Sequence, residues 1–299
     1  MSPIALARRC EPVHRAIAGL ASFGYVLYRT DQGESRFAHR SRVSRLWKSA
    51  IDGDLTDYHG VFFAKEGNWD SGSRLVVVFS GMAMNPSSSS LDRYFEKNYR
   101  HIRGLLPHTT AILRIADVGS VNGAFYRNTR DFPDREVVVS ELIEQCADQL
   151  GVARNAVVLI GSSKGATAAV LYGLRDAYTF IAVDPVLSDR YYEEELGDLH
   201  FTRGPVYLDS KNDRFARLLD GGEFNGCGLF ISSEVSAQFD TVRGFVQRLE
   251  SGSDVRLYVS NDPRIDSHPT VARNTNWLVN YLLVCFVEGW PYPAGGVVD

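Results

Sequence analysis

Apolar residues along this chain fall into short continuous runs that alternate with segments of helical periodicity. Runs of this kind are typical of strands that are covered on both faces, as in parallel sheets. The predicted strands lie at 60–64, 74–80, 110–116, 155–160, 178–184, 228–233 and 255–260. The predicted helices between and after them lie at 91–104, 134–150, 164–174, 238–249 and 270–286. This alternation predicts an α/β fold with a mostly parallel sheet, helices on both faces and active groups at the carboxyl ends of the strands.

Two parts of the chain stand outside this alternation. Residues 1–59 predict a helix at 11–24 and a peripheral hairpin that turns at Gln32-Gly33. Residues 60–299 form the main predicted domain. Within it, the segment near 189–226 is charged, aromatic and rich in glycine, which indicates an insertion or lid rather than core.

Composition narrows the class of partner. The chain has 299 residues, 44% hydrophobic and 23% charged, and its net charge of −4 favours a small molecule or glycan over nucleic acid. Its four cysteines are scattered and form no C-x-x-C pair, so we expect neither a disulfide framework nor a metal site, and no cofactor. The cysteines favour a reducing compartment, the cytoplasm. No window reaches the ~20 apolar residues that a membrane span requires.

The sequence Gly161-Ser-Ser-Lys-Gly165 connects a predicted strand to an alanine-rich helix. Small residues at these positions let the chain turn sharply and present Ser163 above the sheet edge, so Ser163 is the candidate nucleophile. An anion-binding turn at a helix N-terminus is the alternative interpretation. A nucleotide P-loop does not fit, because neither Ser nor Thr follows Lys164 in the required spacing.

This turn, the strand that ends in Ser80-Gly81-Met82 and a late histidine together resemble the α/β-hydrolase superfamily, over about residues 60–290. A narrower resemblance rests on Arg114-Ile-Ala-Asp117, on Gly123-Ala-Phe-Tyr126 with Asn128-Thr129, and on the serine turn. These stretches are similar to motifs of capsular polysaccharide biosynthesis proteins of the XcbB/CpsF type and of related accessory secretion proteins that acetylate glycans. Ala166 departs from the second glycine expected there.

In that superfamily the chain order is serine, acid, histidine. Of the seven histidines only His200 and His268 follow Ser163, and His200 lies in the insertion before the strand that should supply the acid. His268, between the last strand and the last helix, is therefore the candidate base. The alternative is a loop histidine at the start of that helix.

The acid should follow the strand at 228–233. Glu234 is the first candidate, Asp240 is the alternative, and Asp213 and Asp266 are further possibilities. The resemblance implies that the backbone amides of Met82 and Lys164 form the oxyanion hole. The Lys164 side chain either contacts an anionic substrate or bonds a nearby carboxylate.

These expectations lead to a serine-dependent acyl, most simply acetyl, transferase or esterase that acts on a bacterial surface or capsular glycan. Aromatic side chains available for stacking on sugars are Trp69, Tyr126, Tyr191 and Tyr192. Two alternatives stay open: a small-molecule carboxylesterase, and a catalytically inert hydrolase-fold subunit of a polysaccharide assembly or secretion complex. A homo-oligomer or an assembly partner is compatible with each of them.

Overall fold

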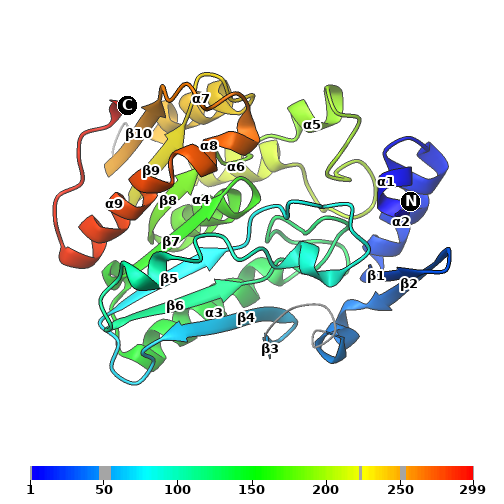
Figure 1. Ribbon diagram of the computed structural model, residues 1–299, viewed down its shortest axis with the longest axis horizontal. Coiled ribbons are helices and arrows are strands. Elements are labelled where there is room, and N and C mark those ends of the chain that lie inside the picture. Colours follow the sequence, from blue (N-terminus) through cyan, green and yellow to red (C-terminus); the bar gives the residue numbers. More distant parts are fainter. Residues whose placement is uncertain (1, 47–54, 222–223, 250–253, 299) are drawn as a thin grey trace.

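The computed structural model describes residues 2–46, 55–221, 224–249 and 254–298 (Figure 1). The described strands are β1 (Tyr25–Asp31), β2 (Glu34–His39), β3 (Thr56–Tyr58), β4 (Val61–Gly67), β5 (Arg74–Phe79), β6 (Thr110–Ile115), β7 (Val157–Ser162), β8 (Thr179–Val183), β9 (Cys227–Ser232), β10 (Asp254–Ser260) and β11 (Gly296–Val298). The described α-helices are α1 (Pro3–Ala7), α2 (Glu11–Ser22), α3 (Arg135–Leu150), α4 (Lys164–Asp176), α5 (Arg190–Glu194), α6 (Lys211–Asp220), α7 (Phe239–Leu249), α8 (His268–Asn274) and α9 (Asn276–Glu288). Short 3₁₀ helices are η1 (Arg40–Arg45), η3 (Leu91–Tyr94), η4 (Ile102–Gly104) and η5 (Arg154–Ala156).

The main sheet of the described chain has nine strands in the order β11-β10-β9-β8-β7-β5-β6-β4-β3. The pairs from β11 through to β6 are parallel, and β4 and β3 add antiparallel pairs at one edge. All carboxyl ends of the parallel strands therefore meet at one edge of the sheet, where the chain turns into helices and loops. The predicted mostly parallel α/β fold is confirmed.

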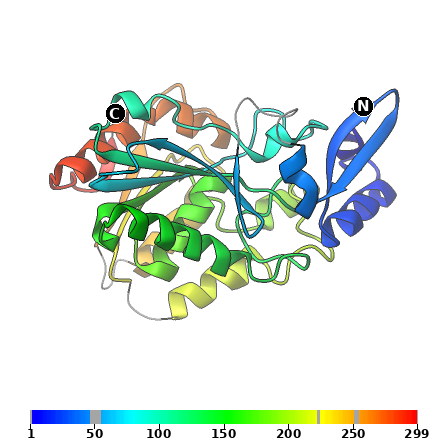
Figure 2. The ribbon, with the colours of Figure 1, turned by 90° about the horizontal axis from the view of Figure 1, so that it is seen from below.

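Both faces of the sheet are covered because the central strands carry consecutive apolar residues, which are buried on both sides. In β5, Leu75, Val77 and Phe79 pack into one buried cluster, whereas Val76 and Val78 pack into the other. Helices α3, α4 and α7 contribute to the first cluster and α9 to the second, so the helices flank the sheet on opposite sides (Figure 2).

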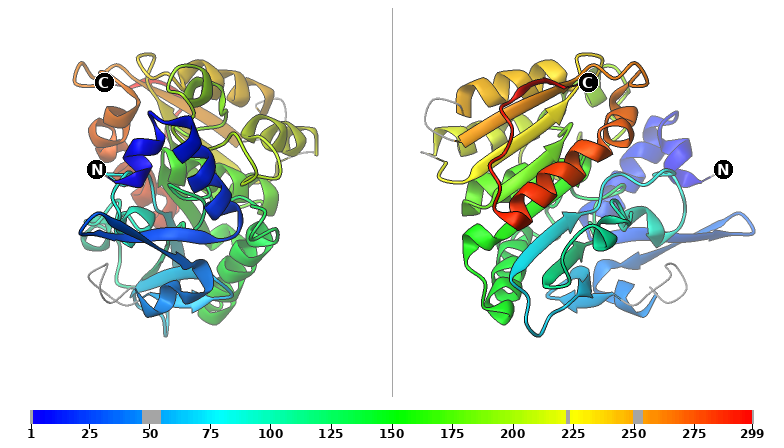
Figure 3. Two further views of the ribbon diagram at one scale, coloured as in Figure 1. Left: turned by 90° about the vertical axis from the view of Figure 1, so that its right-hand side faces the viewer. Right: turned by 60° about the vertical axis from the view of Figure 1, so that its left-hand side comes forward.

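The N-terminal part forms its own small layer. Strands β1 and β2 pair antiparallel as a separate two-stranded sheet, with positive φ at Gln32 (48°) and Gly33 (84°) in the predicted turn. Strand β3 lies before the boundary predicted at residue 59 but pairs with β4, so it is part of the main sheet. Helices α1 and α2 pack against Phe201 and Val206 of the 189–226 segment. Figure 3 shows the two helices beside this segment.

Three sequence-based expectations need correction. The helix predicted at 91–104 is wrong, because this stretch forms η3 and η4 joined by loop. The buried Arg93 side chain donates to the Leu27 and Ser90 carbonyls, which fixes an irregular backbone there. The helix predicted at 270–286 is divided between α8 and α9, near Thr275, whose hydroxyl donates to the Val271 carbonyl.

The segment 189–226 is also not all peripheral. Its helix α6 packs on α4, and Phe215 belongs to the main core cluster. Helix α6 is amphipathic and has ten residues, with its apolar side on the core. The polar composition of the segment therefore does not indicate that the whole segment is peripheral. Residues 222 and 223 of this predicted insertion lie outside the described residues. Within the described ranges, no helix has both the length and the apolar character that a bilayer crossing requires.

Candidate active site

Ser163 occupies a sharp turn between β7 and α4. Its φ of +50° lies in a region that L-residues rarely adopt, and the turn closes only because the flanking residues are glycines. A Cβ at Gly161 would lie 2.2 Å from the carbonyl carbon of Gly165, and a Cβ at Gly165 would lie 2.4 Å from the carbonyl oxygen of Phe79. The glycine spacing is therefore a packing requirement of this turn, which holds Ser163 at the carboxyl end of the sheet.

Ser163 contacts the histidine that chain order favoured. Its Oγ lies 2.8 Å from Nε2 of His268, across 105 positions of sequence. His268 is the first residue of α8, and Ser267 and Thr270 form a capping box at the start of that helix. The cap fixes the helix end and with it the direction of the imidazole.

The carboxylate that orients His268 is Asp184. Its Oδ2 lies 2.6 Å from Nδ1 of His268, and only 1% of Asp184 is exposed. Because a carboxylate only accepts hydrogen bonds, this contact assigns the imidazole proton to Nδ1 and leaves the Nε2 lone pair toward Ser163. Ser163, His268 and Asp184 thus form one continuous hydrogen-bonded chain.

Neighbouring strands explain why Asp184 reaches this position. Strands β7 and β8 are paired, with Ser162 opposite Val183, so the residues that follow both strands leave the sheet side by side. The Ser163 amide donates to the Val183 carbonyl at 2.9 Å, and the Asp184 amide donates to the Ile231 carbonyl at 2.7 Å. Asp184 is therefore anchored to β9 on its other side.

The prediction that Glu234 supplies the acid is wrong, as is its alternative Asp240. Glu234 is exposed, and Asp240 pairs on the surface with Arg243 while 84% of its side chain remains exposed. What the end of β9 supplies instead is two hydroxyl donors. Ser232 Oγ donates to Asp184 Oδ1 at 2.6 Å, and Ser236 Oγ donates to Asp184 Oδ2.

The two remaining carboxylate candidates have local roles. Asp213 takes part in the cap of α6, where Ser210 Oγ lies 2.7 Å from its Oδ2. Asp266 accepts from Ser267 Oγ at 2.7 Å and from Thr270 Oγ1 at 2.9 Å, and these hydrogen bonds lower the pKa of Asp266. Neither carboxylate is the hydrogen-bond partner of His268.

A cavity of about 550 Å³ opens beside Ser163 and His268. Its wall is mainly apolar, with contributions from the loop after β5, from α8 and from the 189–226 segment. The lining residues outside the hydrogen-bonded chain include Met82, Met84, Tyr192, Leu199, His200 and Ala272. The Gly81 amide donates to Asn98 Oδ1 at 2.6 Å, which holds the loop just before Met82. Of the four aromatic residues considered for sugar stacking, Tyr192 lines this cavity.

The Lys164 side chain is not among those that line the cavity. It is fully buried, its Nζ lies 3.2 Å from Asp117 Oδ2, and burial lowers its pKa. Asp117 also accepts from the amides of Phe125 at 2.9 Å and Tyr126 at 3.2 Å. Of the two roles considered for this side chain, the structure thus shows the bond to a carboxylate.

The motif residues that precede the serine turn in the sequence make contacts with other parts of the protein. Gly123 has φ of +98°, and a Cβ there would lie 2.4 Å from both Asp117 Oδ2 and Lys164 Nζ. Arg114 donates to Glu66 Oε1 at 2.7 Å, and Asn128 and Glu136 bond each other's amides at the start of α3. These residues lie outside the cavity lining.

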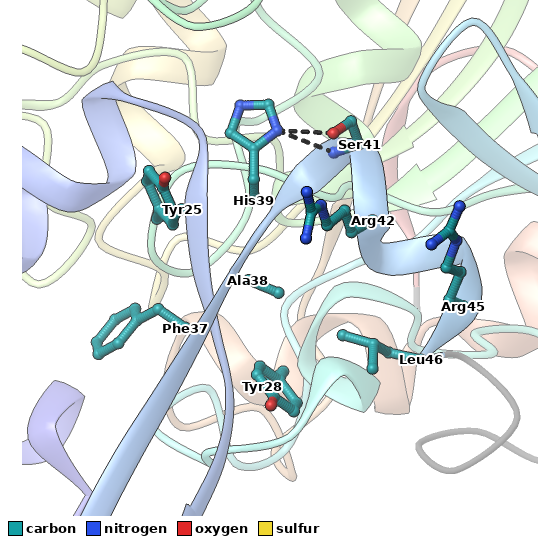
Figure 4. Close-up of a pocket in the computed structure, with 9 residues that line it drawn as sticks. All are labelled: Tyr25, Tyr28, Phe37, Ala38, His39, Ser41, Arg42, Arg45 and Leu46. Carbon is teal, nitrogen blue, oxygen red and sulfur yellow. Dashed lines mark hydrogen bonds between the residues drawn. The ribbon is translucent and has the colours of Figure 1, made fainter.

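A separate cavity of about 640 Å³ lies on the N-terminal part (Figure 4). It is lined by Tyr25, Tyr28, Phe37, Ala38, His39, Ser41, Arg42, Arg45 and Leu46. His39 Nδ1 lies 2.8 Å from Ser41 Oγ, a local contact at the start of η1. Since no carboxylate is bonded to His39 in the described part of the chain, this pair lacks the arrangement seen at Ser163. The described residues also contain no group of three or more His, Cys, Asp or Glu that could hold a metal ion.

This chain is similar to known proteins in its structure but not detectably in its sequence. No family model matches the sequence, and no curated protein matches it. A Glycosylation Associate Protein (Gap123) complex from Streptococcus agalactiae matches with a TM-score of 0.54 and 15% identity, over 76% of this chain and 44% of that chain. This chain therefore spans less than half the length of that protein.

Two further solved structures match over most of both chains. The capsule O-acetyltransferase of Neisseria meningitidis serogroup A gives a TM-score of 0.52 at 13% identity, over 78% of this chain and 94% of that chain. An arylesterase gives a TM-score of 0.51 at 13% identity, over 93% and 90%. With the strand order and the serine turn, these likenesses show that the chain has the α/β-hydrolase fold and resembles capsule acetyltransferases in its fold.

Proposed function

We propose that this chain is a serine-dependent acyltransferase or esterase whose catalytic residues are Ser163, His268 and Asp184. The observation that supports it best is the continuous hydrogen-bonded chain, with 2.8 Å between Ser163 and His268 and 2.6 Å between His268 and Asp184. Serine is a weak nucleophile until an adjacent base accepts its proton. The apolar cavity beside it has room for an acyl group and part of an alcohol.

In the first half of the proposed reaction, Ser163 Oγ attacks the carbonyl carbon of an ester while His268 Nε2 takes the serine proton. The ester C–O bond then breaks, and His268 gives that proton to the departing alcohol oxygen. Asp184 keeps the imidazole in the required tautomer and stabilises the imidazolium. In the second half a hydroxyl, of water or of a sugar, attacks the acyl-serine while His268 Nε2 takes the hydroxyl proton. The bond between the acyl carbon and Ser163 Oγ then breaks, and His268 gives that proton to Ser163 Oγ.

The negative charge on the carbonyl oxygen needs donors in both halves. We assign the backbone amides of Met82 and Lys164 to this role. Lys164 is the first residue of α4, where helix N–H groups point outward without an intrahelical acceptor, and Met82 lines the cavity. The Lys164 side chain is held by its buried ion pair with Asp117, and this pair positions the backbone amide of the same residue.

The substrate class in this proposal is a bacterial surface or capsular glycan that carries, or accepts, an acetyl group. Support comes from the motif resemblance and from two fold neighbours, a capsule O-acetyltransferase and a glycosylation-associated protein complex. The complex also favours an assembly partner. A cytoplasmic location is part of this proposal, and the four free cysteines are compatible with it.

A fluorophosphonate probe tests the proposal directly, because only an activated serine reacts with it. We expect covalent labelling at Ser163, loss of labelling in Ser163→Ala and His268→Ala, and retention in Ser162→Ala, the adjacent serine of the same turn. Absence of labelling in the wild-type protein would instead support the inert-subunit alternative. Turnover of p-nitrophenyl acetate with a sugar present, and analysis of the products for acetate and acetylated sugar, then separates esterase from transferase.

A further inference from the structure

His200 lies in the same cavity as Ser163 and His268 but outside the hydrogen-bonded chain. It lines the cavity and is 5% exposed. Its ring stacks on Tyr192 with centroids 3.8 Å apart and lies 4.9 Å from the ring of Phe125. These contacts fix the plane of the imidazole without using either of its nitrogens.

The two nitrogens have no protein partner in the described structure. Nδ1 is buried without a hydrogen-bond partner, and no hydrogen bond joins Nε2 to another described residue. Burial is the main cause that lowers the pKa of His200 well below its usual value, and the nearby charges of Lys211 and His268 act in the same direction. The ring is therefore neutral at neutral pH.

A neutral imidazole carries one N–H, and its position follows from the surroundings. A buried N–H without an acceptor is more costly than a buried lone pair without a donor, so the proton belongs on Nε2 rather than on the enclosed Nδ1. Tyr192 stacks on one face of the ring and the Phe125 ring lies beside it, tilted by 55°, and His200 lines the cavity. A polar group with this burial and no partner needs an explanation.

The surroundings also define the chemistry of what binds there. The two lysines near His200 are committed to carboxylates, Lys164 to Asp117 and Lys211 to Asp189, and both are fully buried. The remaining wall contains Leu199 and Tyr192. An uncharged group with oxygen acceptors fits this environment better than an anion, because no cation in the described lining is free to pair with one.

Position relative to His268 indicates which part of the substrate is involved. Tyr192, on which His200 stacks, lies edge-on to His268 with ring centroids 6.4 Å apart. In the proposed reaction His268 exchanges its proton with the alcohol oxygen. That oxygen therefore lies in the part of the cavity that His268 and Tyr192 line together with His200.

We propose that His200 binds the alcohol part of the substrate, by donating a hydrogen bond from Nε2 to a hydroxyl or ring oxygen of a neutral sugar. This inference deepens the proposed function and rests on it. In this proposal His268, and not His200, takes the proton from the reacting hydroxyl. Its contribution is to hold the sugar in position on the His268 side of the cavity.

The experiment compares kcat/KM for a neutral methyl glycoside acetate with kcat/KM for p-nitrophenyl acetate. In His200→Leu, which has no donor, we expect the ratio of the two values to fall about tenfold, the loss of one neutral hydrogen bond. In His200→Gln, whose amide donor lies near the position of Nε2, the ratio should stay within about threefold of wild type. The melting temperature should not fall in His200→Leu, because no protein hydrogen bond is lost.

His14→Gln is the matched control. His14, in α2, is a second buried histidine, and it packs against the 189–226 segment: it stacks on Phe201 at 4.4 Å and its Nε2 lies 3.1 Å from Asp198 Oδ2. If the ratio of the two kcat/KM values changes only because this segment is loosened, the same change should appear in His14→Gln. If it changes because the proposed contact is lost, His14→Gln should keep the wild-type ratio. A ¹⁵N spectrum of the wild-type protein adds a direct readout, in which His200 is expected as the neutral Nε2–H tautomer.

The outcomes separate this inference from the proposed function. If the wild-type protein neither reacts with fluorophosphonate nor hydrolyses p-nitrophenyl acetate, the proposed function fails. If it does both, but His200→Leu lowers both kcat/KM values equally or changes neither, the inference about His200 alone is overturned. It is also overturned if the labelled wild-type enzyme acts on no sugar ester.

Discussion

Asp184 and His268, 84 positions apart in the chain, are joined by a 2.6 Å contact between Oδ2 and Nδ1. The contact joins the end of β8 to the start of α8 over the carboxyl edge of the sheet. Ser232 and Ser236 hold Asp184 from the other side. The acid of the proposed site is thus built into the sheet beside the serine strand, with β9 supporting it.

The first prediction follows from this arrangement. Asp184→Asn should lower kcat by about 10³- to 10⁴-fold, because an amide that presents its NH₂ to Nδ1 favours the wrong imidazole tautomer. Glu234→Gln and Asp240→Asn, which change exposed carboxylates, should leave kcat unchanged. Steady-state kinetics on p-nitrophenyl acetate measure this. A larger loss in Glu234→Gln than in Asp184→Asn would overturn the assignment of the acid.

The sequence predicted the elements that depend on local pattern. Continuous apolar runs located the central strands, and the glycines around Ser163 identified the turn, because each of those glycines is required by a close backbone approach. Chain order then pointed to His268. These features are local, or follow from order along the chain, so a single sequence contains them.

Asp184 depends instead on which strands are neighbours. Its sequence context, an aspartate directly after an apolar run and before Pro185, predicts only the end of a strand. Only the pairing of β7 with β8 places that aspartate beside Ser163. A usable signal was present, since a carboxylate at the carboxyl end of the strand next after the nucleophile is a candidate wherever the two strands pair.

The second prediction concerns the packing of the serine turn. Gly165→Ala should destabilise the protein by at least about 1–3 kcal/mol, because its Cβ would lie 2.4 Å from the Phe79 carbonyl oxygen. Gly244→Ala is the control, because that glycine lies in α7 with nothing within 4 Å of the added Cβ. Alanine there should add about 0.5–1 kcal/mol of stability. Urea unfolding of the two variants measures both effects, and equal stability would contradict the packing argument.

The third prediction concerns the buried pair of Lys164 and Asp117. Lys164→Met should destabilise the protein by about 3–5 kcal/mol, because the buried Asp117 carboxylate loses its nearest cation and keeps two backbone donors and Arg135 Nη1 at 3.9 Å. Lys65→Met, at an exposed lysine, serves as the control. The double variant Lys164→Met/Asp117→Asn should recover part of the loss. A Lys164→Met protein of full stability but with weaker binding of anionic esters would restore the substrate-contact role.

The fourth prediction is a pH dependence of stability. His200 is buried and its pKa is lowered in the folded state, so below about pH 6.5 the unfolded chain binds a proton that the folded chain does not. Stability due to His200 is therefore complete above this pH, and decreases by about 1.4 kcal/mol per pH unit as the pH falls toward the folded-state pKa. His200→Gln removes this titration. As the pH decreases from 7.5 to 5, the melting temperature of the wild-type protein should fall more steeply than that of the variant. An equal pH dependence of the two melting temperatures would show that His200 does not titrate in this way.

The last prediction concerns the role of the 189–226 segment as a cover for the site. Helix α6 belongs to the core, so deletion of the whole segment would unfold the protein, and the test must lie in the part that faces the cavity. Leu199 lines the cavity, whereas Leu196 of the same segment is 44% exposed and does not. If this wall excludes water from the acyl-serine, Leu199→Ala admits water and raises the share of acyl groups lost to hydrolysis. With p-nitrophenyl acetate as donor and a neutral methyl glycoside as acceptor, we expect the ratio of acetate to acetylated sugar to rise several-fold in Leu199→Ala and to stay unchanged in Leu196→Ala. The same ratio in both variants, with unchanged melting temperatures, would show that the segment does not control access of water.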